Sequence, residues 1–365
     1  MVRKKKNNIL FSAAQLREFS TRTFTYFGVP DEDAVLAADV LAYSDEHGID
    51  SHGIARLKTY FDLLRTNKIN PKPELRIVRE RTSVATIDGD NGLGLVVGPK
   101  CMEIAIQKAR LHGSGWVSVC NTNHYGAAGY YPVMALKDDI IGLSMTNTTK
   151  GVAPFNGVEK MLGTNPIAIA FPGLKEPPII IDFASSAVAY GKVEIAEREG
   201  DEMPLGWCID KQGKPTTLPM NMIKGGALLP LGADKNGSGH KGYCLAGMVD
   251  ILSAVLSGAN WGPFTVPFAI DSAPAERQVG KGIGHFFGAM DIDGFRDVDE
   301  FKSNIDDWIH TMRNTAPIPG TAGVLIPGDP ERAAYKIRME KGIPLHGDVV
   351  EALKSISSYI GVKLG

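Results

Sequence analysis

Long apolar runs, paired cysteines and a strong net charge are all missing from this chain of 365 residues. No stretch of about 18 apolar residues occurs, so the sequence predicts no membrane span. The four cysteines, Cys101, Cys120, Cys208 and Cys244, are scattered and include no CxxC pair. That pattern favours reduced thiols in a cytoplasmic protein over a disulfide framework or a zinc knuckle. The net charge of -2 gives no electrostatic reason to expect binding to nucleic acid or to an anionic membrane.

The two common nucleotide-binding motifs are also missing or incomplete. Gly92-Leu-Gly94-Leu-Val-Val97 follows an expected strand and opens an expected helix. However, valine stands at position 97, where the dinucleotide fingerprint needs a third glycine. The pattern therefore favours a glycine turn that leads into a packed helix. The P-loop motif GxxxxGK[ST] does not occur, so we expect any dinucleotide to bind outside the usual Rossmann motif.

The residues that are present have an ordinary globular balance, with 44% hydrophobic and 22% charged, and the chain is long enough for two or three packed units. Helical patterns dominate residues 1–78, beginning with a capping box at Ser12. Strand-like and helical segments alternate over residues 79–239, which predicts α/β structure with a mixed sheet flanked by helices. Residues 240–365 are expected to be mainly helical and to pack with the first part. A Gly/Pro-rich stretch, which runs to about residue 288, interrupts the helices after the first one.

The local patterns also predict individual elements. Expected helices cover residues 12–27, 30–43, 52–66, 97–111, 241–259, 298–313 and 329–341. Expected strands cover residues 75–78, 83–88, 115–119, 140–146, 166–171 and 178–181.

The expected helix over residues 52–66 carries three polar side chains at a spacing of four. His52, Arg56 and Tyr60 share one stripe, because residues four apart drift only about 40° around a helix. The planar fork of arginine suits a carboxylate, and histidine moves protons near neutral pH. The set therefore fits a small carboxylate that bears a hydroxyl or carbonyl group. A solvated polar face is the alternative, which spacing alone does not exclude.

A metal site formed by His47 and His52 is a second alternative for this segment. The two histidines are five residues apart, which on a helix turns them about 140° from each other. The zinc-binding helix motif uses a spacing of four, and Gly48 and Asp50 indicate that a helix begins here. We therefore expect no metal, and a non-catalytic zinc-binding protein remains the alternative from a different functional class.

Other polar residues follow expected strands or precede expected helices. His124 lies in the loop after the strand 115–119, where α/β proteins commonly place catalytic groups; an exposed turn histidine is the alternative. Asp182 follows a strand, and either accepts hydrogen bonds in a site or caps the next helix. Lys241 lies at the start of a long apolar helix, where lysine and free N–H groups can hold an anion. The alternative for Lys241 is a solvated side chain.

Together these stretches resemble the malate/L-lactate dehydrogenase family, which also contains ureidoglycolate and sulfolactate dehydrogenases. The resemblance runs from about residue 12 to about residue 340, in the same order. The segments that carry it are Ser51–Arg56, Asn123–Gly126, Gly163–Pro166, Asp182–Ser186, Gly206-Trp207, Lys214–Thr217 and Gly239–Gly242. It implies a non-Rossmann, sulfolactate-dehydrogenase-like α/β fold with a helical domain, in which residues 79–239 bind the nucleotide.

The resemblance also implies an activity and a set of site residues. Members transfer hydride between NAD(H) or NADP(H) and 2-hydroxy or 2-oxo acids, as homodimers. The expected proton carriers are His124, ahead of His52, and the expected substrate-binding residues are Ser51, Arg56 and Tyr60. Cofactor contacts are expected at Thr148, Asp182, Phe183, Ala184, Lys241, Gly328 and Asp329. Malate is the favoured substrate and NAD the favoured cofactor, while NADP, lactate and ureidoglycolate stay open.

The sequence departs from the family pattern in two loops. Thr148-Thr149-Lys150 follows Asn147, where the family often has Ser-Pro or Thr-Pro. Ser238-Gly239 replaces the usual double glycine before His240. These differences bear on loop geometry and substrate choice, not on the class of reaction.

Overall fold

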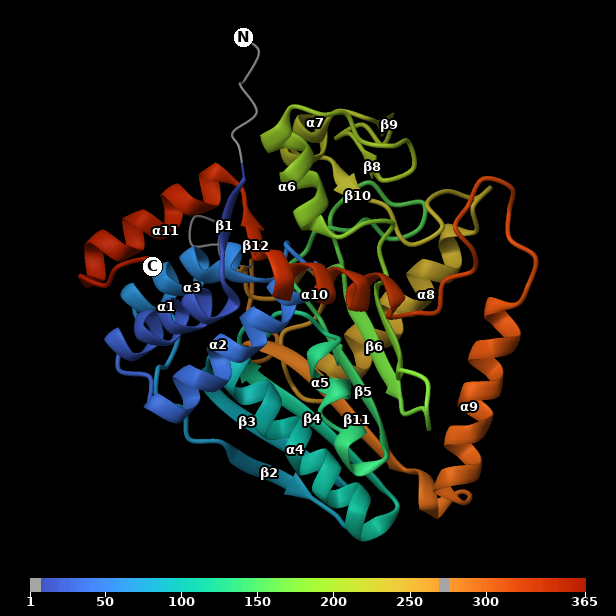
Figure 1. Ribbon diagram of the computed structural model, residues 1–365. Helices are drawn as coiled ribbons and strands as arrows, with labels where there is room; N and C mark the ends of the chain where they lie inside the picture. The colour runs from blue at the N-terminus through green and yellow to red at the C-terminus, as the bar shows by residue number, and fades with distance from the viewer. Residues whose placement is uncertain (1–7, 269–275) are drawn as a thin grey trace.

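The computed structural model describes residues 8–268 and 276–365 (Figure 1). The α-helices are α1 (Ala13–Tyr26), α2 (Asp31–Glu46), α3 (Leu57–Arg65), α4 (Gly94–His112), α5 (Tyr130–Val133), α6 (Tyr190–Glu199), α7 (Pro219–Ile223), α8 (Gly239–Asp250), α9 (Val298–Arg313), α10 (Asp329–Lys341) and α11 (Gly347–Ile360). The strands are β1 (Ile9–Phe11), β2 (Arg76–Glu80), β3 (Val84–Gly92), β4 (Ser114–Thr122), β5 (Ile140–Thr146), β6 (Pro166–Phe171), β7 (Ile179–Ala184), β8 (Cys208–Ile209), β9 (Pro215–Thr216), β10 (Ala227–Leu228), β11 (Ile283–Asp291) and β12 (Ile343–Leu345). Two irregular helices matter below: the 3-10 turn η1 (Ile54–Arg56) and the π-helical η3 (Ile251–Val255), which prolongs α8.

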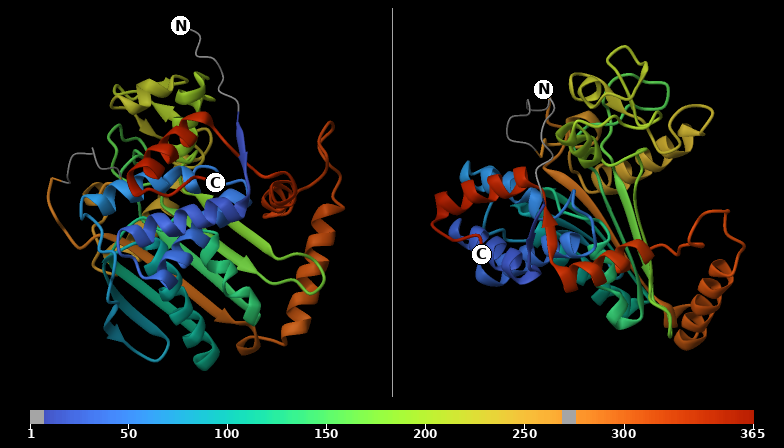
Figure 2. Two further views of the ribbon diagram at one scale, coloured as in Figure 1. Left: turned by 60° about the vertical axis from the view of Figure 1, so that its left-hand side comes forward. Right: turned by 45° about the horizontal axis from the view of Figure 1, so that its top comes forward.

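A mixed sheet of seven strands forms the centre of the molecule, in the order β2-β3-β4-β11-β5-β6-β7. β3 and β4 run parallel and are joined by α4, while the other neighbouring strands in it are antiparallel. α4 packs on one face, where Met102 and Phe287 share a core. α8 covers the opposite face, where Val249 packs with Met145 and Phe286 (Figure 2). The expected α/β fold with a mixed sheet flanked by helices is confirmed.

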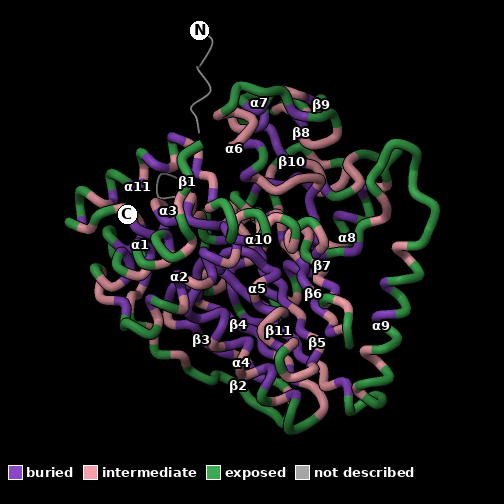
Figure 3. The backbone as a smooth tube through the Cα atoms, viewed as in Figure 1, coloured by how far each residue is buried: buried purple, intermediate pink, exposed green. Residues whose placement is uncertain are grey.

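A helical layer lies beside α4 and the sheet. α1, α3 and α11 pack together through the buried residues Leu16, Phe61 and Ile356, and each of the three helices has both buried and exposed parts (Figure 3). β1 pairs antiparallel with β12, so that Ile9 lies opposite Leu345. A smaller unit, made of the sheet β10-β8-β9 with α6 and α7, has its own core. The division of the chain at residues 78 and 239 stays a prediction.

The Gly/Pro-rich stretch before residue 288, in which no strand was expected, contains most of β11. This strand lies between β4 and β5 in the middle of the sheet. Its glycines hide the strand pattern, and close approach requires them. A Cβ on Gly284 would overlap the carbonyl oxygen of Ser253, and a Cβ on Gly288 would overlap the ring of Trp116. Glycine within a strand commonly marks such a close approach.

The helix expected from His52 begins later than the spacing predicts. His52 lies in the turn before η1 and α3. The buried carboxylate of Asp45 accepts a hydrogen bond from Ile54 N at 2.7 Å, and a Cβ on Gly53 would overlap that carboxylate. Because Asp45 fixes this turn, the three polar side chains do not lie on one continuous helix, and the predicted stripe is wrong as a helical feature.

We expect Asp45→Ala to lower the free energy of unfolding by about 1–3 kcal/mol, because it leaves the buried Ile54 N–H without its acceptor. Gly53→Ala should also destabilise the protein, since its Cβ has no room. Gly247→Ala in α8 is the matched control, because an added Cβ there meets nothing within 4 Å and alanine is favoured in a helix. Denaturant unfolding measures all three, and equal stability would contradict the role of Asp45.

Candidate active site

His124 lies where the sequence predicts, in the loop after β4, and the start of α4 presses against this loop. A Cβ on Gly94 would overlap the carbonyl oxygens of Asn123 and His124. Asn123 Nδ2 in turn donates to Gly92 O at 2.9 Å. The incomplete glycine motif is therefore a packing feature, in which glycine lets the helix approach the histidine loop closely.

The imidazole of His124 has three aromatic neighbours. Tyr60 Oη lies 2.7 Å from His124 Nδ1, and Gly126 N donates to the same nitrogen at 3.3 Å. The ring of His52 lies nearly parallel to that of His124, with 5.8 Å between centroids, and the ring of Phe268 does so at 4.1 Å. Although no continuous helix carries them, the structure thus brings His52, Tyr60 and His124 together; we call these three the histidine cluster.

The surroundings hold both imidazoles of the cluster in the neutral form at neutral pH. Burial, helped by the positive charge of Arg56, lowers the pKa of His52 to about 4. Burial lowers the pKa of His124 well below 6.5, with further contributions from His52, Arg56 and His285. Both histidines keep some contact with solvent, but protein groups crowd them on most sides. Burial also raises the pKa of Tyr60, so its hydroxyl stays protonated.

Arg56 is held in place by two contacts. Its Nε donates to Ser51 O at 2.7 Å, and its Nη2 lies 2.7 Å from Glu194 Oε2. α6 comes close here because Gly191 has no side chain, and a Cβ on it would meet Ser51 and Arg56. Arginine has five N–H donors, and these two contacts leave further N–H groups for a ligand. Ser51 also contacts the histidine cluster, since its Oγ lies 2.8 Å from His52 Nδ1.

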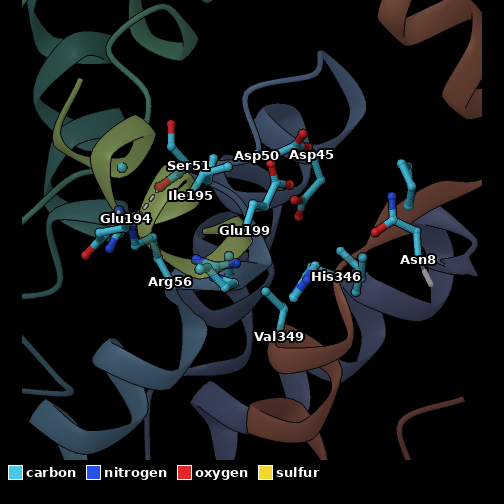
Figure 4. A pocket seen from close by; sticks show the side chains of 15 residues that line it. Asn8, Asp45, Asp50, Ser51, Arg56, Glu194, Ile195, Glu199, His346 and Val349 are labelled. Carbon is cyan, nitrogen blue, oxygen red and sulfur yellow. Dashed lines mark hydrogen bonds and ion pairs between the residues drawn. The ribbon is translucent and has the colours of Figure 1, made fainter. Parts of the chain in front are cut away.

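A hollow of about 210 Å³ lies beside Arg56 and is lined in part by Ser51 and by the Arg56–Glu194 ion pair (Figure 4). No member of the histidine cluster lines it. Besides the Arg56–Glu194 pair, its wall carries the acidic side chains of Asp45, Asp50 and Glu199 against one arginine, Arg198, a balance that disfavours an anionic ligand. The side of Arg56 that faces the histidine cluster is therefore the better position for a substrate carboxylate.

The expected cofactor residues Asp182, Phe183 and Ala184 lie within β7, at the edge of the sheet, and not after the strand as predicted. Asp182 Oδ2 accepts a hydrogen bond from Gly129 N at 2.8 Å. The Asp182 side chain is reached by solvent, yet surrounding protein raises its pKa to about 6.

The other expected cofactor residues lie near the two ends of β7 or at the start of α8. Thr148 Oγ1 accepts from Thr164 N at 3.0 Å, close to the end where Ala184 pairs with β6. Gly328 follows Pro327, whose carbonyl accepts from Ile180 N at 3.1 Å. Lys241 is exposed in the first turn of α8.

Asp329 has internal partners. Its carboxylate accepts from Ile326 N at 2.9 Å and pairs with Arg313 and Arg332. The carboxylate of Asp329 and its backbone N–H, which donates to Ile326 O at 2.9 Å, are therefore both engaged in the turn before α10.

His47 and His52, the alternative metal pair, have different partners. His47 Nδ1 lies 2.8 Å from Tyr43 O, and its ring stacks on that of Tyr43. Over residues 8–268 and 276–365, no three His, Cys, Asp or Glu side chains are placed to hold a metal ion. Over the same residues, no helix is both long and apolar enough to cross a membrane.

Sequence reasoning missed three residues that touch the site. Glu194 pairs with Arg56 across 138 positions, Phe268 stacks on His124, and Asp45 fixes the turn that carries His52. Phe268 lies in the Gly/Pro-rich stretch, which has no periodic pattern. Only Asp45 has a sequence signal, since an acidic residue there follows the mostly apolar segment 34–43.

Comparisons with known proteins show which family the chain belongs to. The sequence profile of the malate/L-lactate dehydrogenase family matches residues 11–354. The malate dehydrogenase of Pyrococcus horikoshii is 41% identical over 359 residues, which cover 98% of this chain and 97% of that protein; its structure aligns with a TM-score of 0.88. The L-sulfolactate dehydrogenase of Methanocaldococcus jannaschii is 41% identical over 338 residues, 93% of each chain.

The crystal structure of malate dehydrogenase from Entamoeba histolytica is 35% identical, with a TM-score of 0.92, and the alignment covers 98% of this chain and 99% of that one. Sequence and fold are thus shared along nearly the whole length. The chain belongs to the malate/L-lactate dehydrogenase family of hydroxy-acid dehydrogenases.

Proposed function

We propose that the protein transfers hydride between NAD and a small 2-hydroxy acid, with (S)-malate and oxaloacetate as the favoured pair. The observation that carries the proposal is the 2.7 Å contact between Tyr60 Oη and His124 Nδ1, with the Arg56 cation close enough to lower the pKa of His124. Oxidation of a hydroxyl next to a carboxylate needs a proton acceptor and a cation that binds the carboxylate. Malate is favoured because a relative at 41% identity is a malate dehydrogenase.

In the proposed reaction, Arg56 binds the C1 carboxylate through N–H groups that Ser51 and Glu194 leave free. His124 accepts the hydroxyl proton at Nε2 in the tautomer whose Nδ1–H donates to Tyr60 Oη, whereas the hydrogen bond from Gly126 N to Nδ1 belongs to the other tautomer. The hydroxyl of Tyr60 can then donate to His124 O, which lies 3.4 Å away. In the reverse direction the same imidazole returns the proton to the carbonyl oxygen. His52, held by Ser51, is the alternative proton carrier.

The residues around β7 fit a dinucleotide. Asp182 offers an accessible carboxylate that can accept hydrogen bonds from sugar hydroxyls, and Lys241 offers an exposed cation for a phosphate. Gly328 has a φ of 97°, which favours glycine, and the guanidinium of Arg332 occupies the space where a Cβ would lie. NAD, when bound, would accept the hydride that leaves C2. NADP is the alternative cofactor.

The test is a panel of 2-oxo acids, including oxaloacetate, pyruvate and sulfopyruvate, with NADH or NADPH, followed by loss of nicotinamide absorbance. We expect turnover with NADH and oxaloacetate. Sulfopyruvate tests the second candidate, sulfolactate, which the M. jannaschii relative at 41% identity favours. No oxidation of either nucleotide by any acid would refute the enzyme assignment.

The proposed base makes a prediction for pH dependence. A neutral imidazole is the active form, so oxidation should be lost as pH falls through the pKa of His124, and that pKa lies below 6.5. We therefore expect kcat/KM for malate oxidation to stay level from about pH 8 to pH 6.5 and to fall only in more acid solution. A midpoint at or above 6.5 in the pH–rate profile would count against His124 as a buried neutral base.

We also propose a homodimer. Exposed apolar side chains on α8 and η3 offer one face for such contact, namely Tyr243, Met248, Ile251 and Val255. Sedimentation of the purified protein tests this, and a monomer at the assay concentration would refute it.

A further inference from the structure

We propose that Phe268 is a positioning residue, which sets the plane of the His124 imidazole and shields it from water, and that Thr149 holds Phe268 in place. The inference rests on the proposed function, because it assigns the transferred proton to His124. No motif in the sequence marks Phe268, whereas Thr149 lies in one of the two loops where the sequence departs from the family pattern. Two ring contacts and one shared hydroxyl carry the inference.

Phe268 contacts both partners of the key hydrogen bond. Its ring lies 4.1 Å from the ring of His124, with 20° between the planes. It also meets the ring of Tyr60 edge-on, with 5.1 Å between centroids. The Tyr60 hydroxyl fixes one nitrogen of the imidazole, but the ring can still rotate about that contact. A parallel ring removes this freedom, so the stack and the hydrogen bond together fix the direction of Nε2.

The hydroxyl of Thr149 fixes the backbone of Phe268. Phe268 N donates to Thr149 Oγ1 at 2.9 Å, and the same hydroxyl donates to Val266 O at 3.3 Å. Thr149 therefore joins the end of β5 to the segment that reaches the active site. A second link lies just before it, where Asn147 Nδ2 donates to Thr265 Oγ1 at 2.9 Å. The backbone that carries the Phe268 ring is thus held by the loop after β5, next to the expected cofactor contact Thr148.

Charged and titratable groups face His124 from four other parts of the chain. They are His52 in the turn before η1, Arg56 in η1, Tyr60 in α3 and His285 in β11. Positive charge on His52, Arg56 or His285 disfavours a second proton on His124, as burial does, and burial is the largest cause. The face of a phenyl ring attracts an imidazolium, which acts in the opposite direction. Because burial dominates, removal of the ring should make protonation of His124 easier.

The experiment follows the His124 imidazole by NMR titration of the full-length protein, with the signal assigned by its loss in His124→Asn. In Phe268→Ala we expect the pKa of His124 to rise by about one unit or more, as water reaches the ring. The acid limb of kcat/KM should move by the same amount. Turnover should fall about tenfold through loss of orientation, while KM for the nucleotide stays unchanged. Phe268→Tyr keeps the flat ring and should restore both values.

Two further pairs of variants separate positioning from general damage. Thr149→Val loses both hydrogen bonds and should shift the titration in the same direction as Phe268→Ala, whereas Thr149→Ser keeps them and should match the parent protein. Phe264→Ala, in the same segment but packed on Trp261, is the control and should leave the His124 titration unchanged.

An unshifted His124 titration in Phe268→Ala would overturn the inference, as would equal effects of Thr149→Ser and Thr149→Val. If the parent protein transfers no hydride with any 2-oxo acid, the proposed function fails on its own. The titration needs no substrate, so it still tests whether Phe268 shields and orients His124.

Discussion

His124→Ala should lower kcat by about 10²–10⁴, the usual contribution of a positioned general acid or base. The substitution removes the group that accepts the hydroxyl proton and leaves Tyr60 without its 2.7 Å partner. KM should change little, because the carboxylate is bound by Arg56. Steady-state rates with oxaloacetate and NADH measure the effect, and thermal unfolding of the variant shows whether the fold is intact.

His52→Ala is the matched comparison, because its ring lies next to that of His124 and is held by Ser51. A smaller loss of kcat is expected, since His52 orients the cluster without taking the proton. Near-normal turnover in His124→Ala, together with a large loss in His52→Ala, would reverse the order of the two histidines.

Arg56→Ala should raise KM for the 2-hydroxy acid by about 10–150-fold, which corresponds to the loss of roughly 1.5–3 kcal/mol from a charge-assisted hydrogen bond. Arg56→Lys keeps the charge but loses the planar fork, so KM should rise there too, by less. KM for the nucleotide should stay constant in both variants. An unchanged KM for the acid would remove Arg56 from the carboxylate.

Two controls isolate the role of the guanidinium. Arg65→Ala removes an exposed arginine from the end of α3, where it pairs with Asp62, and should leave KM unchanged. Glu194→Gln weakens the ion pair that orients Arg56 but keeps the cation. If KM rises less in Glu194→Gln than in Arg56→Ala, Arg56 binds the carboxylate and Glu194 only orients Arg56.

Local patterns predicted much of the sheet. The strands at residues 140–146 and 166–171 have the predicted bounds, because short apolar runs between turn residues point to strands without help from the rest of the fold. β11 was missed for the opposite reason. Its glycines at 284 and 288 make room for Ser253 and Trp116, and such a requirement exists only once the sheet is assembled.

The candidate site, like the sheet, was predicted only in part from the sequence. His124 was placed after a strand by its local context, and the roles of the cluster came from the family resemblance. The contacts that complete the site join residues far apart in sequence, as between Arg56 and Glu194 or His124 and Phe268. Glu194 and Phe268 carry no local signal, because a glutamate in a helix and a phenylalanine in a loop have many ordinary roles. Assignment of these residues needed the folded chain.

The position of β11 in the sheet also affects how the protein folds during its synthesis. β4 and β5 each pair with β11 and not with each other, so both keep an unpaired edge until residue 291 has been added. The ribosome adds roughly 5–20 residues per second, so the 145 positions from Thr146 to Asp291 take about 7–30 s to synthesise. During that interval two apolar strands of the nascent chain offer free backbone groups to other chains. Slow translation of this segment should therefore favour aggregation, and occupation of the two edges by a chaperone should favour a high yield of folded protein.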